Sequence, residues 1–379
     1  MNYNFSYWEK TSFFSADIII VGSGIVGLTA AIALKQHNPK LNVLVLERGF
    51  LPSGASTKNA GFACFGSLSE LIEQEKTSGT DGLHALIQRR WNGLQKLRQL
   101  LGDKHIDFNG YGGFELFRKE DEELTNLCVS KISHFNALIE DIVGKHAFSE
   151  AHEKIDYFGF NHISSLIENQ FEGQINTGKM MRALINKVAA SGVQILNSCE
   201  VEGFEKGSDQ RIHIKTQQGI FICKKLIFAN NAFISSFFKD LDVKPGRGQV
   251  IVTKPIPSLK VKGTFHYDKG YYYFRNIDHR ILFGGGRNLD FKTEETTIFG
   301  HTEKILQALS AILKDIILPD TAFEIDYNWS GIMAFGNQLE PIIKEVEPDV
   351  FCAVRCNGMG VAMGSQTGQD VADLVLSTF

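Results

Sequence analysis

The sequence lacks the features that define several classes of protein. No stretch approaches the roughly 18 consecutive apolar residues of a membrane-spanning helix, and residues 1–17 lack the basic start and apolar run of a signal peptide. A formal net charge of −4 gives no basic excess for binding nucleic acid. The six cysteines form no CxxC pair and no Cys/His grouping at zinc-finger spacing. We therefore expect a cytoplasmic protein without a membrane span, a nucleic-acid partner or a metal site.

The composition is that of a folded protein with ample core. The chain has 379 residues, of which 43% are hydrophobic and 22% charged, and this length suits two domains. Its 36 glycines make up a larger share of the chain than the average of about 7%. Glycine is used where backbone turns sharply or approaches a ligand closely, so the positions of the glycines carry information.

A strand–glycine–helix–strand pattern opens the chain. Residues 16–21 (ADIIIV) predict a buried strand, residues 22–27 (GSGIVG) follow at once, and residues 28–36 predict a helix. Residues 42–46 predict a second buried strand that ends at Glu47. A GxGxxG segment that follows a strand, opens a helix and precedes an acid by about 20 residues is the dinucleotide-binding fingerprint.

Each residue of this fingerprint has its own physical task. Gly22 permits the tight turn, Gly24 lets backbone N–H groups approach a pyrophosphate, and Gly27 lets the helix pack on the strands. The helix N-terminus adds free N–H groups and the positive end of its dipole. Glu47 is expected to accept hydrogen bonds from ribose hydroxyls.

The middle of the chain alternates between helical and extended patterns. Residues 68–101 are helical with an interruption near residues 77–82, and residues 179–191 are helical again. Residues 271–275 and 280–284 predict antiparallel strands joined by a turn. Because the dinucleotide-type segments surround the β-rich ones, we expect the second domain to be built from insertions.

Several blocks of sequence, in order, resemble the FAD-dependent oxidoreductases of the D-amino acid oxidase superfamily, which includes glycine oxidase, sarcosine oxidase and gamma-glutamylputrescine oxidase. The blocks are Ser6-Tyr7-Trp8, VGSGIVGLTAA, VLERG, GASTKNAG, GRGQV at residues 246–250 and CNGMGVAMGSQTGQDVADLV at residues 356–375. The resemblance covers nearly the whole chain. It is specific for the superfamily but not for the substrate.

The resemblance implies an α/β fold with a Rossmann-like FAD-binding domain and an interleaved α+β substrate domain on a large mixed β-sheet. We assign residues 1–67, 171–243 and 329–379 to the FAD-binding domain. Residues 68–170 and 244–328 then form the substrate domain.

The resemblance also implies an extended FAD, with its adenosine end near Glu47 and Val201 and its isoalloxazine near residues 58–61. The expected FAD-binding residues are Gly22, Ser23, Gly24, Ile25, Val26, Gly27, Glu47, Arg48, Ala55, Ser56, Thr57, Lys58, Asn59, Ala60, Gly61, Val201, Ala229, Asn230, Gly331, Gly358, Met359, Gly360, Val361 and Ala362. Neither residues 329–333 nor Lys58-Asn59 offers the cysteine or histidine that some members use for covalent attachment. We therefore expect noncovalent FAD.

On the substrate side, block alignment points to Tyr271 and Arg287, with Lys58 and Arg355 as further candidates. The tyrosines around Tyr271 are as compatible with packing in a sheet as with contact to the ligand. Lys58 is as compatible with a solvated position as with a position near the flavin. Family members usually anchor the substrate carboxylate with an Arg shortly after the block at residues 329–331, but this chain has Met333 there. Either Arg287 or Arg355 replaces it, or the substrate amine carries no adjacent carboxylate.

The expected reaction is oxidation of a C–N bond in a small amine or amino acid by hydride transfer to flavin N5, giving an imine that hydrolyses. Oxygen or an electron carrier is the expected acceptor. Two alternatives stay open at this point: an FAD-dependent 2-hydroxy acid dehydrogenase, and a flavin-binding scaffold without turnover.

Overall fold

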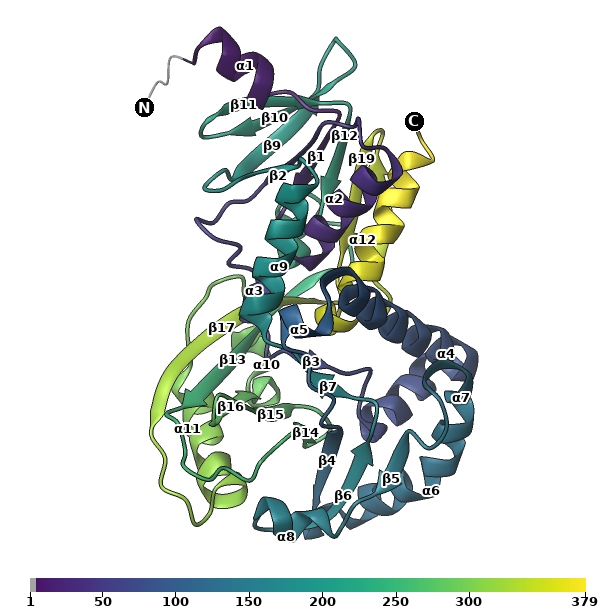
Figure 1. Cartoon of the computed structure of the whole chain (residues 1–379), viewed down its shortest axis with the longest axis vertical. Helices are drawn as coiled ribbons and strands as arrows, with labels where there is room; N and C mark the ends of the chain where they lie inside the picture. The colour runs from purple at the N-terminus through teal and green to yellow at the C-terminus, as the bar shows by residue number, and fades with distance from the viewer. Residues whose placement is uncertain (1–4) are drawn as a thin grey trace.

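The computed structural model describes residues 5–379 and has two lobes, each built on a large β-sheet (Figure 1). The upper lobe holds a six-stranded sheet, and the lower lobe holds an eight-stranded one. This arrangement confirms the predicted fold class, an α/β Rossmann-like domain with an interleaved second domain on a large mixed sheet.

The upper sheet has the order β18-β19-β12-β1-β2-β8. Its strands are β18 (Ile342–Glu347), β19 (Val350–Val354), β12 (Lys225–Phe228), β1 (Ile18–Val21), β2 (Val43–Leu46) and β8 (Gln194–Leu196). All neighbouring pairs are parallel except β18 and β19. β1, β2 and β12 are buried at every residue, because both faces of the sheet are covered.

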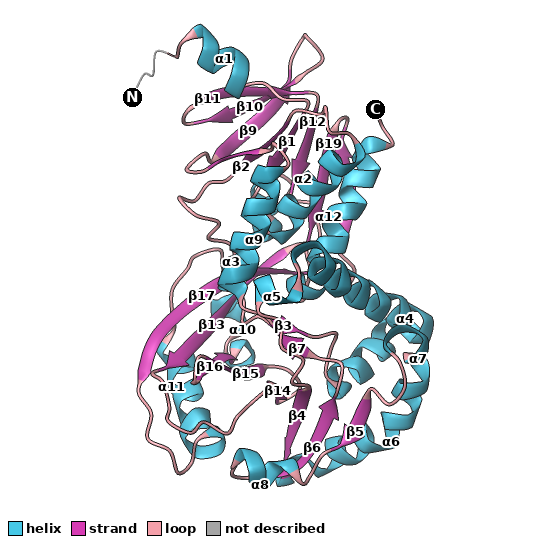
Figure 2. Ribbon diagram, in the orientation of Figure 1, coloured by secondary structure: helices cyan, strands magenta, loops and turns pink. Residues whose placement is uncertain are grey.

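Helices cover one face of this sheet and a small sheet covers the other (Figure 2). The helices are α2 (Ile25–His37), α9 (Thr177–Ala190) and α12 (Gly360–Leu376); the small sheet comprises β9 (Val201–Lys206), β10 (Ile212–Thr216) and β11 (Gly219–Cys223). The exposed helix α1 (Tyr7–Phe13) precedes β1. The carboxyl ends of β1, β2, β12 and β19 share one edge of the sheet, where open α/β sheets bind ligands.

The lower sheet has the order β17-β13-β16-β15-β14-β4-β6-β5. Its strands are β17 (Ile325–Phe335), β13 (Lys244–Thr253), β16 (Arg280–Gly285), β15 (Tyr272–Ile277), β14 (Thr264–Tyr267), β4 (Gly113–Arg118), β6 (Ile163–Asn169) and β5 (Phe148–Glu150). Only β14 and β4 pair in parallel. On β15, Tyr272 and Phe274 pack in the core while Tyr273 and Arg275 face the opposite side, so this strand shows the side-chain alternation of a β-strand.

The helices α6 (Glu122–Leu138), α7 (Glu140–Val143), α8 (Lys154–Phe158), α10 (Phe291–Glu294) and α11 (Glu303–Ile312) pack around this sheet, as does the first part of α4 (Leu68–Leu101). The last part of α4 and the short helix α5 (Asp103–Ile106) pack in the core of the upper lobe through Leu94, Leu97, Leu101 and Ile106. Within α4, Gly79 has a non-helical φ of 70°, which confirms the predicted interruption near residues 77–82.

One predicted domain boundary falls inside a strand. The assignment placed residue 329 at the start of an FAD-binding segment, but β17 runs through this position and pairs with β13 along most of its length. Residues 325–335 therefore belong to the lower sheet. The boundary predicted at residue 244 coincides with the start of β13.

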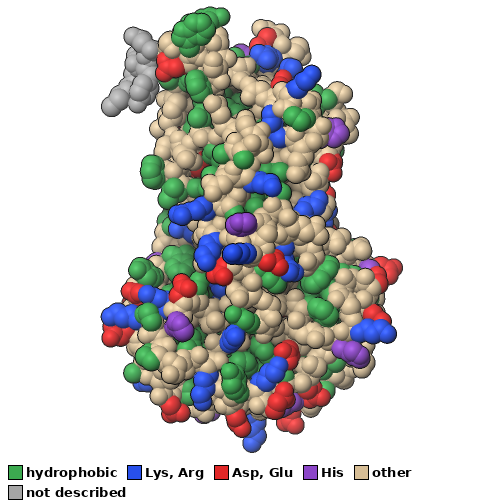
Figure 3. Space-filling model, in the orientation of Figure 1, with side chains coloured by type: hydrophobic (Ala, Val, Ile, Leu, Met, Phe, Trp, Pro, Cys, Tyr) green, Lys and Arg blue, Asp and Glu red, His purple; other side chains and the backbone are tan. Residues whose placement is uncertain are grey.

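Three further findings concern membrane-spanning helices, surface charge and the cysteines. Within residues 5–379, no helix is both long enough and apolar enough to cross a membrane. Basic and acidic side chains are interspersed over the visible face of the lower lobe (Figure 3). All six cysteines are buried and free.

Candidate functional site

A cavity of about 780 Å³ extends from the carboxyl edge of the upper sheet to the face of the lower sheet. This volume lies toward the upper end of the range for ligand pockets. The sequence-predicted residues in its wall are Gly22, Ser23, Gly24, Ile25, Val26, Glu47, Arg48, Ala55, Ser56, Lys58, Asn59, Ala60, Gly61, Val201, Ala229, Asn230, Tyr271, Arg287, Gly331, Gly358, Met359, Gly360, Val361 and Ala362. Gly27, Thr57 and Arg355 do not line it.

Close packing explains the glycines where β1 passes into α2. A Cβ on Gly22 would lie 2.8 Å from the carbonyl oxygen of Ala229, and a Cβ on Gly24 would lie 2.8 Å from Ser56 Oγ. A Cβ on Gly27 would lie only 2.0 Å from the carbonyl oxygen of Gly22. Gly27 thus supports the turn from outside the cavity.

Glu47 is buried at the far end of the cavity from Arg287, at the end of β2. Its Oε2 accepts hydrogen bonds from Ser23 N at 3.1 Å and Ser23 Oγ at 2.6 Å, and its Oε1 accepts one from Gly49 N at 2.8 Å. Next to it, the Arg48 guanidinium lies over the Phe233 ring at 3.6 Å. The carboxylate that was predicted from its spacing therefore also ties the glycine turn to β2.

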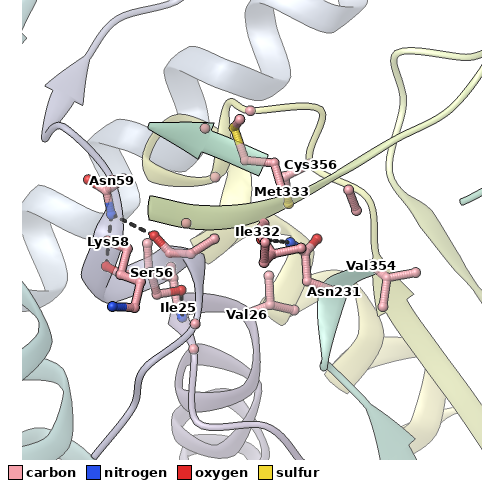
Figure 4. A pocket seen from close by; sticks show the side chains of 18 of the residues that line it. Ile25, Val26, Ser56, Lys58, Asn59, Asn231, Ile332, Met333, Val354 and Cys356 are labelled. Carbon is pink, nitrogen blue, oxygen red and sulfur yellow. Dashed lines mark hydrogen bonds between the residues drawn. The ribbon is translucent and has the colours of Figure 1, made fainter. Parts of the chain in front are cut away.

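The short helix α3 (Ala55–Lys58) borders the middle of the cavity (Figure 4). Ser56 Oγ accepts a hydrogen bond from Ile25 N at 2.9 Å, which fixes α3 against the start of α2. Asn59 Nδ2 donates to Ser56 O at 2.8 Å, and Asn59 Oδ1 accepts from Gly61 N at 2.8 Å. Thr57 points elsewhere, because its hydroxyl donates to the carbonyl oxygen of Pro52.

The N-terminus of α12 completes this part of the wall. Gly358 has a φ of +82°, a backbone conformation that favours glycine, and a Cβ there would meet no closer atom than Met333 Sδ at 3.8 Å. The nearest atom to a Cβ on Gly360 would be 3.9 Å away. The backbone is therefore accessible from the cavity at a helix N-terminus, where N–H groups favour an anionic ligand. Together with the glycine turn, this elongated wall fits a dinucleotide.

Aromatic and cationic side chains form the opposite end of the cavity. Tyr271 and Tyr273 both line it, and burial raises the pKa of the Tyr273 phenol to about 12. The Tyr273 hydroxyl has no hydrogen-bond partner among residues 5–379, so it is available as a neutral donor. Tyr273 was not among the site residues selected from the sequence.

The two candidate arginines have different environments. Arg287 lines the cavity, where its guanidinium lies 3.9 Å from the Phe335 ring centre and 5.0 Å from that of Phe291. The guanidinium makes no hydrogen bond or ion pair within the described part of the chain, and burial lowers its pKa. The Arg287 guanidinium is therefore available to an anionic ligand.

Arg355 is buried, and the two terminal nitrogens of its guanidinium already have partners, whereas its Nε has none among residues 5–379. Its guanidinium donates to Asp242 Oδ2 at 2.7 Å and to the carbonyl oxygen of Glu340 at 2.8 Å. The structure therefore does not bring Arg355 to the cavity, and it corrects the expectation that this residue could bind substrate. Met333 lies in the wall beside Gly358.

Lys58 lies in the wall of the cavity at the end of α3. Its Nζ is 5.3 Å from the centre of the Phe299 ring, and its carbonyl oxygen accepts a hydrogen bond from Trp329 Nε1 at 2.9 Å. Phe299 itself is 39% exposed, so this ammonium lies at the rim of the cavity.

A polar cluster at the same end, in which Cys64, Glu172 and His266 are buried and Glu70 is half-buried, was not selected from the sequence. It contains Cys64, Glu70, Glu172 and His266, of which Cys64, Glu70 and His266 line the cavity. Burial alone lowers the pKa of His266, but Glu172, Glu70 and Glu115 together raise it to about 9. Burial raises the pKa of the Cys64 thiol well above its usual range. The four residues are too far apart in sequence for a spacing motif to reveal them.

Comparison with known proteins identifies the class of protein. Residues 17–374 match the DAO family, described as FAD dependent oxidoreductase. The chain therefore belongs to the DAO family of FAD-dependent oxidoreductases, and its cofactor is FAD.

Individual relatives are distant but cover most of the chain. The probable oxidoreductase OrdL of Haemophilus influenzae is 23% identical over 391 residues, which cover 99% of this chain and 86% of that protein. L-proline dehydrogenase from P. horikoshii superposes with a TM-score of 0.75 at 20% identity, covering 96% of this chain and 94% of that one. Glycine oxidase from Geobacillus kaustophilus has a TM-score of 0.74 at 21% identity, with 96% and 95% covered. At these identities the solved structures establish the fold.

Proposed function

We propose that this protein oxidises the C–N bond of a small amino acid whose carboxylate is bound by Arg287. The observation that carries the proposal is the Arg287 guanidinium, which lines the cavity without a hydrogen-bond or ion-pair partner among residues 5–379. A planar guanidinium matches a carboxylate through two parallel charge-assisted hydrogen bonds. Relatives named glycine oxidase and L-proline dehydrogenase support an amino acid as the substrate class.

When bound, FAD would supply the acceptor for a hydride from the carbon that carries nitrogen. The residues of this chain position the substrate and provide charged and polar groups around it. Arg287 holds one end of the substrate, and the Tyr273 hydroxyl can donate a hydrogen bond from the same end of the cavity. At the other side, the α12 N-terminus offers N–H groups and its positive dipole end to negative charge that develops during the reaction.

The proposal includes noncovalent FAD and a reducing, cytoplasmic compartment, which the six free cysteines support. Three of them, Cys64, Cys199 and Cys356, line the cavity, so the mode of attachment needs a direct test. After acid precipitation, noncovalent flavin stays in the supernatant. Flavin that remains in the pellet would contradict this part of the proposal.

The decisive experiment is anaerobic reduction of the purified yellow holoenzyme. The panel contains primary and secondary amino acids, the corresponding amines without a carboxylate, and 2-hydroxy acids. We expect bleaching of the oxidised flavin band with at least one amino acid and none with its decarboxylated analogue. Bleaching by hydroxy acids alone would favour the dehydrogenase alternative, and no bleaching with any compound would favour a scaffold.

The electron acceptor is tested with the compound that bleaches the flavin. Air is readmitted and peroxide is measured together with the return of the oxidised band. Rapid peroxide formation identifies an oxidase. Slow reoxidation in air that is accelerated by an artificial electron acceptor identifies a dehydrogenase.

A further inference from the structure

Three buried side chains that carry sulfur, nitrogen and oxygen donors meet beside the substrate end of the cavity. Cys64 follows β3 (Phe62–Ala63), Glu172 precedes β7 (Gly173–Gln174), and His266 lies on β14. Because β3 and β7 pair with each other, Cys64 and Glu172 lie at adjoining ends of one small sheet. One donor atom from each of the three residues lies within 4.8 Å of the other two.

The contact between His266 and Glu172 has the spacing of two ligands on one ion. His266 Nε2 is 3.4 Å from Glu172 Oε2, yet this nitrogen forms no hydrogen bond. His266 is only 7% exposed, so an unpartnered nitrogen there is costly. Two ligands that each lie about 2.0–2.1 Å from a tetrahedral zinc ion are themselves about 3.3 Å apart.

The surrounding contacts resemble the supporting shell of a metal site. Glu172 Oε1 accepts hydrogen bonds from Phe65 N and Gly66 N, both at 3.3 Å, which leaves Oε2 directed at His266. On the other side of the imidazole, Nδ1 is 3.8 Å from Glu70 Oε2. Glu70 is itself held by the Ser67 N–H at 3.0 Å. A carboxylate behind a ligating histidine orients the ring and selects its tautomer.

We propose that Cys64, Glu172 and His266 bind a zinc-type divalent cation. A thiolate and an imidazole select against Mg²⁺ and Ca²⁺, which prefer oxygen ligands, and favour zinc. Two anionic ligands neutralise the ion in this buried position. Cys64 and His266 line the cavity, which provides a path for the ion and leaves a fourth coordination position open to a substrate heteroatom. The site differs from the sequence-based expectation of no metal, and it does not depend on the proposed substrate.

The test measures metal rather than turnover. Holoenzyme purified without chelator is stripped of metal, dialysed against a small molar excess of zinc, and analysed for zinc and flavin per chain. We expect one zinc per chain, and zinc-edge X-ray absorption with one sulfur and otherwise nitrogen or oxygen neighbours. Binding displaces protons from Cys64 and His266, so the zinc affinity should fall as the solution is acidified.

Variants test the assignment of the ligands. Cys64→Ser and Glu172→Gln should each lower zinc affinity at least tenfold, and Cys64→Ser should remove sulfur from the absorption spectrum. Cys128→Ser is the matched control, because Cys128 is also buried but lies within α6 and does not line the cavity. Flavin content and thermal midpoint show whether each variant is folded.

The result that overturns the proposal is a wild-type zinc content no higher than that of folded Cys64→Ser. An absorption spectrum without sulfur neighbours overturns it as well. The cluster would then be an ion pair between His266 and its two glutamates. Neither outcome affects the amino acid proposal, because metal content is measured independently of flavin reduction.

Discussion

The two ends of the cavity are built in different ways. At the cofactor end, backbone atoms and glycines of short contiguous segments form the wall, at Gly22–Gly24 and Gly358–Gly360. At the substrate end, side chains from separate elements form it, including Tyr273 on β15, His266 on β14 and Glu70 on α4. The cofactor end therefore depends on close backbone approach, whereas the substrate end depends on the identity of each side chain.

This difference predicts different consequences of mutation. A change at the cofactor end should remove FAD and destabilise the fold together, because ligand binding stabilises the folded state. A change at the substrate end should leave FAD in place and alter the response to substrate. The following predictions run from the largest expected effect to the smallest.

Gly27→Ala should cause the largest loss. The new Cβ would lie 2.0 Å from the carbonyl oxygen of Gly22, and neither backbone can move without disturbing the turn. Overpacking of this kind costs about 1–3 kcal/mol and occasionally more, to which the lost stabilisation by FAD is added. The flavin-to-protein absorbance ratio and the thermal midpoint report both losses. Gly203→Ala is the control, because a Cβ there meets no atom within 4 Å; an unchanged flavin ratio in Gly27→Ala would refute the argument.

Arg355→Met should lower stability without changing carboxylate binding. The variant removes hydrogen bonds to Asp242 and Glu340, and hydrogen bonds to charged groups contribute about 1.5–3 kcal/mol each. Denaturant unfolding measures the loss, and titration with a carboxylate inhibitor, followed by the flavin spectrum, measures binding in the folded protein. Weaker inhibitor binding by a folded Arg355→Met would return this residue to the list of substrate ligands.

Arg287→Met should weaken carboxylate binding without lowering stability. FAD and the thermal midpoint are retained, because the guanidinium forms no hydrogen bond or ion pair in the described chain. Loss of a charge-assisted carboxylate contact of about 2–3 kcal/mol should weaken amino acid and inhibitor binding roughly 30- to 150-fold. Arg182→Met, at an exposed position on α9, controls for the loss of one positive charge. Equal inhibitor affinity in the two variants would remove Arg287 from the proposal.

Tyr273→Phe should have the smallest effect. One neutral hydrogen bond contributes about 0.5–1.5 kcal/mol, so anaerobic flavin reduction should slow by roughly 2- to 13-fold. Because the pKa of Tyr273 is raised to about 12, the phenol stays neutral at roughly pH 10, where an ordinary tyrosine ionises. The pH profiles of wild type and variant should therefore be parallel up to that pH. A step near pH 10 that only the wild type shows would mean that Tyr273 ionises normally.

The sequence was informative wherever function depends on the local conformation of the backbone. The glycine turn, the buried strands beside it and the break in α4 at Gly79 follow from short-range sterics and residue periodicity, and the structure bears them out. Most of the residues assigned to FAD also line the cavity, because they lie within a few contiguous segments. Thr57 was included by its position in such a segment, and only the structure shows that its hydroxyl turns toward Pro52.

Sequence reasoning was weaker where residues far apart in the chain meet. Arg287 and Arg355 were both candidates for the substrate carboxylate in the sequence, and only their tertiary surroundings separate an available guanidinium from one bound to Asp242. The boundary at residue 329 was misplaced because β17 is defined by its pairing with β13, a long-range interaction.

The sequence by itself determined that this protein binds a dinucleotide, because a glycine turn between a strand and a helix is a local property of the backbone. The resemblance of its sequence blocks then indicated FAD, and the family match established it. Only the tertiary structure decided which side chains face the substrate, since that depends on how the upper and lower sheets are packed together. The same packing brought Cys64, Glu172 and His266 within reach of one ion, although no spacing in the sequence connects them.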